Sequence, residues 1–293
     1  MKKQVFRRWA NDPAPLDRLL ALRLSLTRAD AVDLVERGSV YVGTDRADDP
    51  AAEVPVGAKL TVHLTTPSPT PPLVVIHRDA DLAIIDKPAG LPSQPERGQH
   101  AFSLDAAVAR ELGDDARPMH RLDKEVSGLV LVALRPAARA PLQRIVAEHE
   151  SDRRYLAIVV GSLSGEGTIR KRIGRHAADQ RLRAAFPEGS TAGKPAATRY
   201  RVLGHGVLDG RPVTAVDVQL ETGRTHQIRV HLASLNHPIV GDVAYGGPPF
   251  DRLCLHAYAL ELPHPRHGRR LRVSTHVPGV FARLVPGLTS PFT

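Results

Sequence analysis

The 293-residue chain contains a single cysteine, Cys254, so it cannot form an internal disulfide bond. Its cysteine and histidines show no spacing typical of a zinc site, and no glycine-rich loop of the nucleotide-binding type occurs. No apolar run approaches the roughly 18 residues of a membrane-spanning helix. The basic residues 1–9 lead into Ala10-Asn11-Asp12-Pro13, which is not the apolar core of a signal peptide. These absences predict a soluble cytoplasmic protein, in a reduced compartment and without a zinc cluster.

Positive charge, by contrast, is abundant. Lysine and arginine number 40 against 31 aspartate and glutamate residues, which gives a formal net charge of +9 and a pI near 10.1. An excess of this size favours a polyanionic partner, and nucleic acid is the first candidate. The alternative is a basic surface with no specialised partner.

The first part of the chain, residues 13–64, has the pattern of a small domain of its own. Leucines within residues 16–24 recur at helical spacing, and Thr27, with an acidic residue three positions later, predicts the start of a second helix. Alternating apolar residues over 40–42 and 60–64 then predict strands.

Four segments of this region carry a resemblance: Leu16-Asp17-Arg18-Leu19-Leu20, Leu26-Thr27-Arg28, Glu36-Arg37-Gly38-Ser39-Val40-Tyr41-Val42 and Val56-Gly57-Ala58-Lys59-Leu60. They resemble the small RNA-binding module named after the fourth small-subunit ribosomal protein. The resemblance implies that the second helix and the following turn face RNA, which points to Arg28 and Arg37. The alternative is an unrelated two-helix domain whose arginines are ordinary solvated charges.

Residues 65–72 contain four prolines in eight positions. Such a segment cannot form a helix or a central strand, and we interpret it as a linker stiffened toward polyproline II. The boundaries that follow are a basic N-terminal segment over residues 1–12, the small domain, this linker, and a second domain over residues 73–293.

The second domain shows short apolar runs mixed with two helical patterns, over residues 104–112 and 137–148. The runs predict strands at 74–76, 82–85, 129–134, 155–160, 200–203 and 213–220. Because strands and helices do not alternate regularly, we expect an α+β fold with a mixed, mainly antiparallel sheet rather than a doubly wound fold.

A polar loop, residues 120–128, leads directly into the apolar run 129–134, which is typical of a strand buried on both faces. Asp123 in this loop would sit on a rigid platform, where a carboxylate can be offered to a substrate. The alternative is a carboxylate that only caps its own loop. On this segment alone the alternative is favoured.

A second segment, residues 220–233, contains Arg224 before a stretch with helical spacing. Its place at the positive N-terminal end of the expected helix suits a carboxylate or a phosphate. A guanidinium close to Asp123 would favour the ionised carboxylate and fix its orientation. The alternative is an ordinary surface arginine. His226 and His231 are five positions apart, so they do not form the zinc-binding pair of a helix.

Five motifs occur in one order: Lys87-Pro88-Ala89-Gly90, His120-Arg121-Leu122-Asp123 with Ser127-Gly128, Arg153-Arg154-Tyr155-Leu156-Ala157, Gly193-Lys194-Pro195-Ala196 with Thr198, and Thr222-Gly223-Arg224-Thr225-His226-Gln227-Ile228-Arg229. Their order and distances resemble the RluA family of pseudouridine synthases over residues 73–265. The match overturns the purely structural interpretation of Asp123. Few positions depart from the family pattern: Val126 where threonine is usual, Arg153 where lysine is usual, and Asp86 where asparagine is common.

The resemblance implies an isomerase that converts uridine to pseudouridine within RNA. The N1 glycosidic bond breaks, the uracil turns, and C5 is joined to the same ribose, without redox change or cofactor. Asp123 would be the essential carboxylate, acting as a nucleophile toward the sugar or as a base that removes a ribose proton. Tyr155 would stack on the flipped uracil, Arg224 would pair with Asp123, and Arg121 would occupy the space that the base vacates.

The remaining expectations concern RNA. A basic stretch interrupted by glycine and proline is interpreted as a loop that grips phosphates, and the alternative is a disordered surface loop. Its members are Arg170, Lys171, Arg172, Arg175, Arg181, Arg183 and Lys194. Large-subunit ribosomal RNA is the favoured target and transfer RNA the second, with no obligate protein partner. A non-catalytic RNA-binding or ribosome-assembly protein stays open, whereas a hydrolase with paired carboxylates is disfavoured because an arginine takes the second place.

Overall fold

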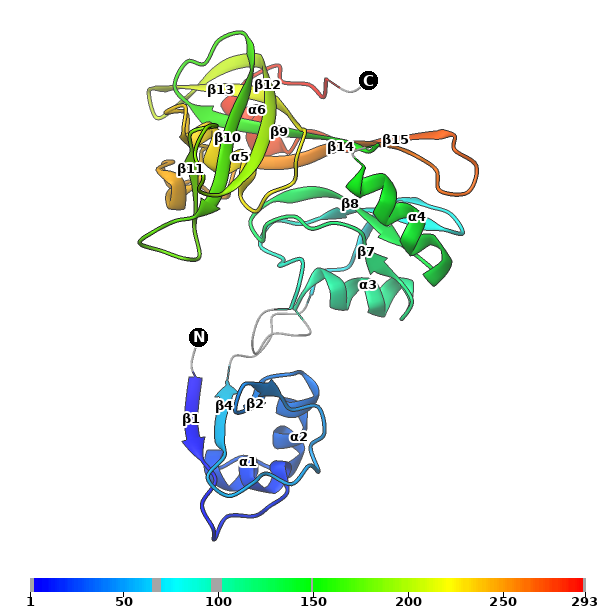
Figure 1. Cartoon of the computed structure of the whole chain (residues 1–293), viewed down its shortest axis with the longest axis vertical. Helices are drawn as coiled ribbons and strands as arrows, with labels where there is room; N and C mark the ends of the chain where they lie inside the picture. Colours follow the sequence, from blue (N-terminus) through cyan, green and yellow to red (C-terminus); the bar gives the residue numbers. More distant parts are fainter. Residues whose placement is uncertain (1–2, 65–69, 96–101, 149, 292–293) are drawn as a thin grey trace. The chain divides into compact units, whose positions relative to one another are not determined.

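A computed structural model describes residues 3–64, 70–95, 102–148 and 150–291 of the chain (Figure 1). They form two compact units, of which the first comprises the residues up to Pro72 together with Pro92–Glu111. The second comprises Leu73–Leu91 and the residues from Leu112 onward. None of the helices within the described ranges is long and apolar enough to cross a membrane.

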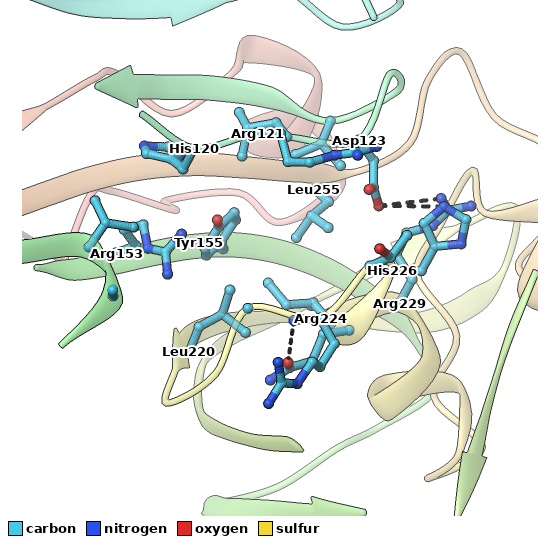
Figure 2. A pocket seen from close by; sticks show the side chains of 18 residues that line it. His120, Arg121, Asp123, Arg153, Tyr155, Leu220, Arg224, His226, Arg229 and Leu255 are labelled. Carbon is cyan, nitrogen blue, oxygen red and sulfur yellow. Dashed lines mark hydrogen bonds and ion pairs between the residues drawn. The ribbon is translucent and has the colours of Figure 1, made fainter. Parts of the chain in front are cut away.

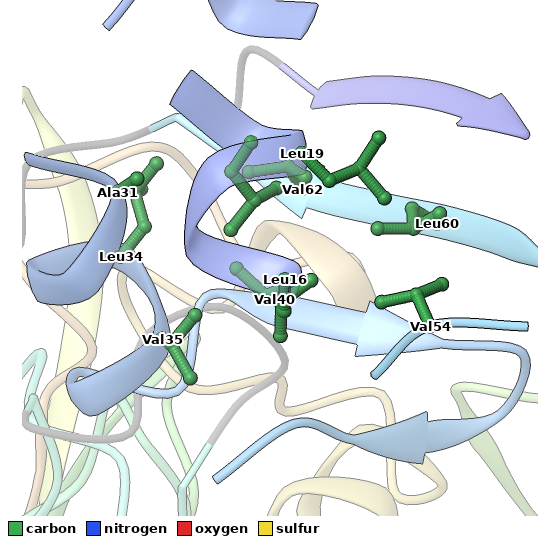
Figure 3. Packing of buried hydrophobic residues seen from close by; sticks show 10 residues of the cluster. Leu16, Leu19, Ala31, Leu34, Val35, Val40, Val54, Leu60 and Val62 are labelled. Carbon is green, nitrogen blue, oxygen red and sulfur yellow. The ribbon is translucent and has the colours of Figure 1, made fainter. Parts of the chain in front are cut away.

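The first unit is built on a four-stranded antiparallel sheet with two helices against it. The strands, in spatial order, are β1 (Lys3–Arg7), β4 (Lys59–His63), β2 (Val40–Val42) and β3 (Asp45–Arg46), and the helices are α1 (Leu16–Leu24) and α2 (Arg28–Glu36). The helices and strands share one apolar core, in which Leu19, Leu34 and Val62 are at most 2% exposed (Figure 3).

Local sequence signals account for much of this unit. Thr27 caps α2, because its hydroxyl oxygen accepts the backbone N–H of Asp30 at 3.1 Å. β1 pairs with β4 from Lys3 to Arg7, so the basic segment anticipated over residues 1–12 contributes a strand to this sheet. Residues 65–69 of the anticipated linker lie outside the described residues.

The second unit is dominated by an eleven-stranded sheet. Its strands are β5 (Val74–Arg78), β6 (Leu82–Lys87), β7 (Arg117–Pro118), β8 (Ser127–Ala133), β9 (Asp152–Val160), β10 (Glu166–Arg175), β11 (Arg183–Phe186), β12 (Lys194–Leu208), β13 (Arg211–Leu220), β14 (Leu255–Pro263) and β15 (Arg270–Ser274). The main path runs β11-β10-β12-β13-β9-β14-β8-β6-β5, with β15 on β14 and β7 on β8. Among these described strands only β8 and β14 pair in parallel, so the expected mixed, mainly antiparallel sheet is confirmed.

The remaining helical segments are α3 (Leu104–Leu112), α4 (Pro136–Ala147), α5 (Gln227–Ala233), the 3₁₀ turn η1 (Val243–Tyr245) and α6 (Gly279–Leu284). α4 packs through Leu142 against Leu129 and Leu131 of β8, which is buried along its whole length. This double burial explains why β8 appears in the sequence as a continuous apolar run.

The basic stretch anticipated as a loop is largely sheet, and this expectation was wrong. Arg170, Lys171 and Arg172 lie in β10, which pairs with β12 on one side and β11 on the other. The strand was missed because Lys171 stands on its inner face between two buried isoleucines, Ile169 and Ile173, and interrupts the apolar alternation. The ammonium of Lys171 is accommodated by donating to the carbonyl of Ser234 at 3.2 Å.

Candidate active site

A cleft of about 390 Å³ opens in the second unit around Asp123 (Figure 2). Its walls come from the loop before β8, from β9, from the segment between the end of β13 and α5, and from the start of β14. Segments more than 100 residues apart in the sequence therefore meet at one carboxylate. The loop reaches β14 because Gly128 of β8 pairs closely with Ala257, where a side chain would not fit.

A buried lysine holds the loop that carries Asp123. Lys87, at the end of β6, has no exposed surface, and its ammonium donates to the carbonyls of Pro88 at 2.9 Å, Leu91 at 2.7 Å and Lys124 at 3.1 Å. Burial lowers the pKa of Lys87 to about 8. Gly90 donates to the same Lys124 carbonyl at 2.9 Å, so the segment 87–90 fixes the residue that follows Asp123.

The side chain of Asp123 is 19% exposed and meets two basic groups (Figure 2). Arg229 Nη1 lies 3.6 Å and His226 Nε2 lies 3.9 Å from the same oxygen, Oδ2. The anticipated pairing of Arg224 with Asp123 is wrong. Arg224 is exposed, and its guanidinium donates to the carbonyl of Pro195 at 3.2 Å. The reason is that α5 begins only at Gln227, so Arg224 stays in the preceding turn while Arg229 comes from the helix.

Arg229 is itself held by a buried carboxylate. Its Nε and Nη2 atoms each donate to one oxygen of Asp242 at 2.7 Å, in the two-pronged geometry that a guanidinium and a carboxylate favour. Its guanidinium also lies 4.9 Å from the centroid of the Tyr245 ring. Burial disfavours the charge on Arg229, but the hydrogen bonds to Asp242 and the negative charges of Asp242 and Asp123 together outweigh this effect, and the pKa of Arg229 is raised.

Tyr155 lines the same cleft from β9, as Figure 2 shows. It is 5% exposed, and burial raises the pKa of its phenol, so the hydroxyl is neutral at neutral pH. Leu255 from the start of β14 adds an apolar surface to the cleft. His120 also lines it and accepts the backbone N–H of Leu131 at 3.2 Å, while burial lowers its pKa to about 3 and keeps it neutral.

The other anticipated RNA contacts are spread over both units. Arg121 is exposed at the edge of the cleft. Arg28 and Arg37 belong to the first unit, where Arg28 pairs with Asp17 and Arg37 lies 3.2 Å from Asp33.

The basic residues of β10 to β12 divide into two groups. Lys171 and Arg172 donate to backbone carbonyls, and the two bonds of Arg172 reach Ala192 at 3.1 Å and Gly193 at 2.8 Å. Arg170, Arg175 and Lys194 are exposed, and Arg170 lies 3.6 Å from Glu221. The exposed group is the one that could reach phosphates.

One group of described residues has metal-ligand geometry, away from the cleft. Ligand atoms of Asp79, Asp81 and His264 lie within 4.8 Å of one another. Two arginines, Arg135 and Arg266, pair with Asp81 and supply the positive charge that a metal ion would otherwise bring. We therefore regard this group as an ion-pair network.

Comparison with known families agrees with this geometry. The sequence profile of the family described as RNA pseudouridylate synthase matches residues 81–234, which include Asp123, Tyr155 and Arg229. The chain belongs to this family of isomerases, which convert uridine to pseudouridine in RNA, and the resemblance to RluA-type enzymes is confirmed.

Individual relatives extend the match beyond the profile. The chain is 34% identical to ribosomal large subunit pseudouridine synthase D of Vibrio cholerae, over 90% of this chain and 87% of the relative. It is 34% identical to the protein of that name in Escherichia coli K12, over 75% and 72%. Among solved structures, human RNA pseudouridylate synthase domain containing 1 superposes with a TM-score of 0.64 at 30% identity, over 77% and 93%.

Proposed function

We propose that this isomerase acts on large-subunit ribosomal RNA and that Asp123 is its essential carboxylate. The observation that carries the assignment of Asp123 is its position in the cleft, with Arg229 3.6 Å from one of its oxygens and Tyr155 in another wall of the same cleft. The choice of RNA is supported by the relatives, since the Vibrio cholerae and Escherichia coli proteins are both named as large-subunit enzymes. The net charge of +9 suits such a polyanion.

The dimensions of the cleft favour a single nucleoside as its occupant. A volume of about 390 Å³ is in the range of sites for small ligands and is too small for a stacked helix. The target uridine must therefore leave its stack, at a cost of a few kcal/mol. Arg121, exposed at the cleft edge, fills the space that the uridine leaves in the RNA.

Within the cleft, Asp123 either attacks C1′ or removes a ribose proton, and in both cases the N1–C1′ bond breaks and the uracil departs with the bonding electrons. Tyr155, neutral and buried, stacks on the freed uracil while it turns. In the first case C5 displaces the Asp123 carboxylate from C1′, and in the second Asp123 returns its proton to the ribose as C5 bonds to C1′. The proton on C5 is then lost and N1 takes one up, so the product is an isomer of uridine. Arg229 takes the orienting role that the sequence suggested for Arg224.

The RNA also needs a surface outside the cleft. The exposed side chains of Arg170, Arg175 and Lys194 provide positive charge in the second unit. Arg28, with 65% of its side chain exposed, provides it in the first unit, which we propose to be an RNA-binding module. Each phosphate contact of this kind adds to the salt dependence of binding.

The assignment of Asp123 is tested with Asp123→Asn, which keeps the shape of the side chain and removes its charge. We expect pseudouridine formation in unmodified large-subunit RNA to fall by about three orders of magnitude or more, because the reacting group is lost. Asp251→Asn is the matched control, since Asp251 is 72% exposed and pairs only with Arg283 among the described residues. Mapping by carbodiimide labelling and primer extension also identifies the uridine. Comparable activity of Asp123→Asn and Asp251→Asn would refute the assignment.

A further inference from the structure

His226, which the catalytic assignment leaves without a role, has an unusual backbone conformation. Its φ of 59° places it in the left-handed region, and it immediately precedes α5. A residue with a Cβ pays about 1–2 kcal/mol for this conformation, and such costs are concentrated at functional sites. The conformation directs the ring between two partners: Nε2 lies 3.9 Å from Asp123 Oδ2, and Nδ1 lies 2.7 Å from the hydroxyl of Tyr245.

Tyr245 determines which nitrogen of His226 carries the proton. The phenolic oxygen of Tyr245 already accepts the backbone N–H of Arg183 at 2.9 Å. Its own hydrogen is therefore directed to His226 Nδ1, with the two rings edge to face at 5.7 Å. Burial lowers the pKa of His226, so the ring is neutral at neutral pH. A neutral imidazole that accepts at Nδ1 has its N–H at Nε2, which is the side that faces Asp123.

The electrostatics at Asp123 favour the same tautomer. The opposite tautomer would place the lone pair of Nε2 toward a carboxylate that is 3.9 Å away, which is repulsive. Arg229 Nη1 approaches the same oxygen, Oδ2, at 3.6 Å. Two polar groups that approach Oδ2 at these distances favour one orientation of the carboxylate by electrostatic attraction and leave Oδ1 as the oxygen for the substrate.

We propose that His226 is a positioning residue, that Tyr245 fixes its Nε2–H tautomer, and that the pair orients Asp123 so that Oδ1 is the oxygen that reacts. The proposal rests on the catalytic role proposed for Asp123. It assigns no proton transfer to His226, whose N–H is an orienting dipole and not an acid. It also gives a role to the strained backbone of His226, since in this conformation the ring lies between Tyr245 and Asp123.

The first arm of the test is spectroscopic and does not depend on activity. Nitrogen-15 spectra of histidine-labelled protein report which nitrogen is protonated, and the signal of His226 among 14 histidines is the one that His226→Gln removes. We expect protonation at Nε2 in the wild type and a mixture of tautomers in Tyr245→Phe, which keeps the ring beside Arg229 and loses the hydroxyl. Tyr258→Phe is the matched control, because it removes a buried hydroxyl that donates to Asp217 and leaves the cleft intact. A proton on Nδ1 in the wild type would overturn the proposal.

The second arm is kinetic. We expect Tyr245→Phe and His226→Phe to lower kcat about tenfold, the value of one well-placed hydrogen bond, with the KM for RNA unchanged. His226→Gln should recover part of the loss, because its amide can present an N–H near the position of Nε2. Wild-type kcat in His226→Phe would contradict the proposal, as would equal losses in the phenylalanine and glutamine variants. Failure of the proposed function is a separate result, because inactive wild-type protein would still show the tautomer.

Discussion

The contact between β8 and β14 can be tested with a single methyl group at Gly128. This glycine has a φ of 117°, and a Cβ built on it would lie 2.2 Å from the oxygen and 2.5 Å from the nitrogen of Ala257. Both atoms belong to the backbone of the neighbouring parallel strand, so no change of rotamer can relieve the overlap. Gly128→Ala must therefore separate the two strands or distort one of them.

The expected loss of stability has two parts. A residue with a Cβ at positive φ costs about 1–2 kcal/mol, and overfilling a packed site costs about 1–3 kcal/mol more. Their sum of about 2–5 kcal/mol is a large part of the 5–15 kcal/mol that typically separates folded from unfolded protein. Gly113→Ala is the matched control, because its φ of 107° is similar and no heavy atom lies within 4 Å of the added Cβ. Only the first part of the cost applies there.

Urea unfolding followed by circular dichroism compares the two variants. We expect the midpoint of Gly128→Ala to fall clearly below that of Gly113→Ala at an unchanged slope. Pseudouridine formation by Gly128→Ala should decrease as well, because Gly128 lies at the end of the loop that carries Asp123 and its partner strand β14 supplies Leu255 to the cleft. Equal midpoints for the two variants would refute the argument that close approach of β8 and β14 positions the site.

Three further outcomes are expected. In single-turnover measurements Arg224→Ala should keep the rate constant within about threefold of the wild type. Arg229→Lys should lower that rate constant about a hundredfold, because it loses the guanidinium fork. The reverse order would support the pairing of Arg224 with Asp123. His256 is buried with a pKa of about 3 against 6.5 unfolded. Its contribution to stability is therefore complete above pH 6.5 and falls by about 1.4 kcal/mol per pH unit toward pH 3. The free energy of unfolding from urea titrations should therefore differ less between pH 5 and pH 7 in His256→Gln than in the wild type. Trp9 is the only tryptophan and is 63% exposed in the first unit; RNA binding there should change its fluorescence, and an unaltered spectrum at saturating RNA would argue against that module.

The sequence was informative where burial leaves a simple pattern. β8 is buried on both faces, so its apolar run and the polar loop before it could be recognised without any structure. Asp123 was then singled out by the order of distant motifs, and three of those motifs, which include His120, Tyr155 and Arg229, supply walls of the cleft that Asp123 lines. The mixed, mainly antiparallel sheet also followed, from short runs without regular alternation.

The choice between two arginines could not be made in the same way. In α5 every residue from Gln227 to Leu232 is buried, so no apolar stripe reveals which face meets the cleft. Arg229 is buried as a charged residue because Asp242, thirteen positions later, accepts both prongs of its guanidinium. That partner lies in the turn before η1, and the hydrogen bond from Val240 to the carbonyl of Ile158 attaches this segment to β9. The role of Lys87 was hidden for a similar reason, since its acceptors are backbone carbonyls.

The pairing of Arg229 with Asp242 has a consequence for the reactivity that we propose for Asp123. A guanidinium that bound Asp123 through two short hydrogen bonds would occupy both oxygens and weaken the carboxylate as a nucleophile or base. Here the two short bonds, both 2.7 Å, go to Asp242, and Asp123 receives only the longer approach of 3.6 Å to one oxygen. The charge of Arg229 is thus largely balanced by Asp242, and its orientation is fixed before substrate arrives. Asp242→Asn should therefore impair catalysis although Asp242 is not among the residues that line the cleft, because it releases Arg229 to pair more closely with Asp123.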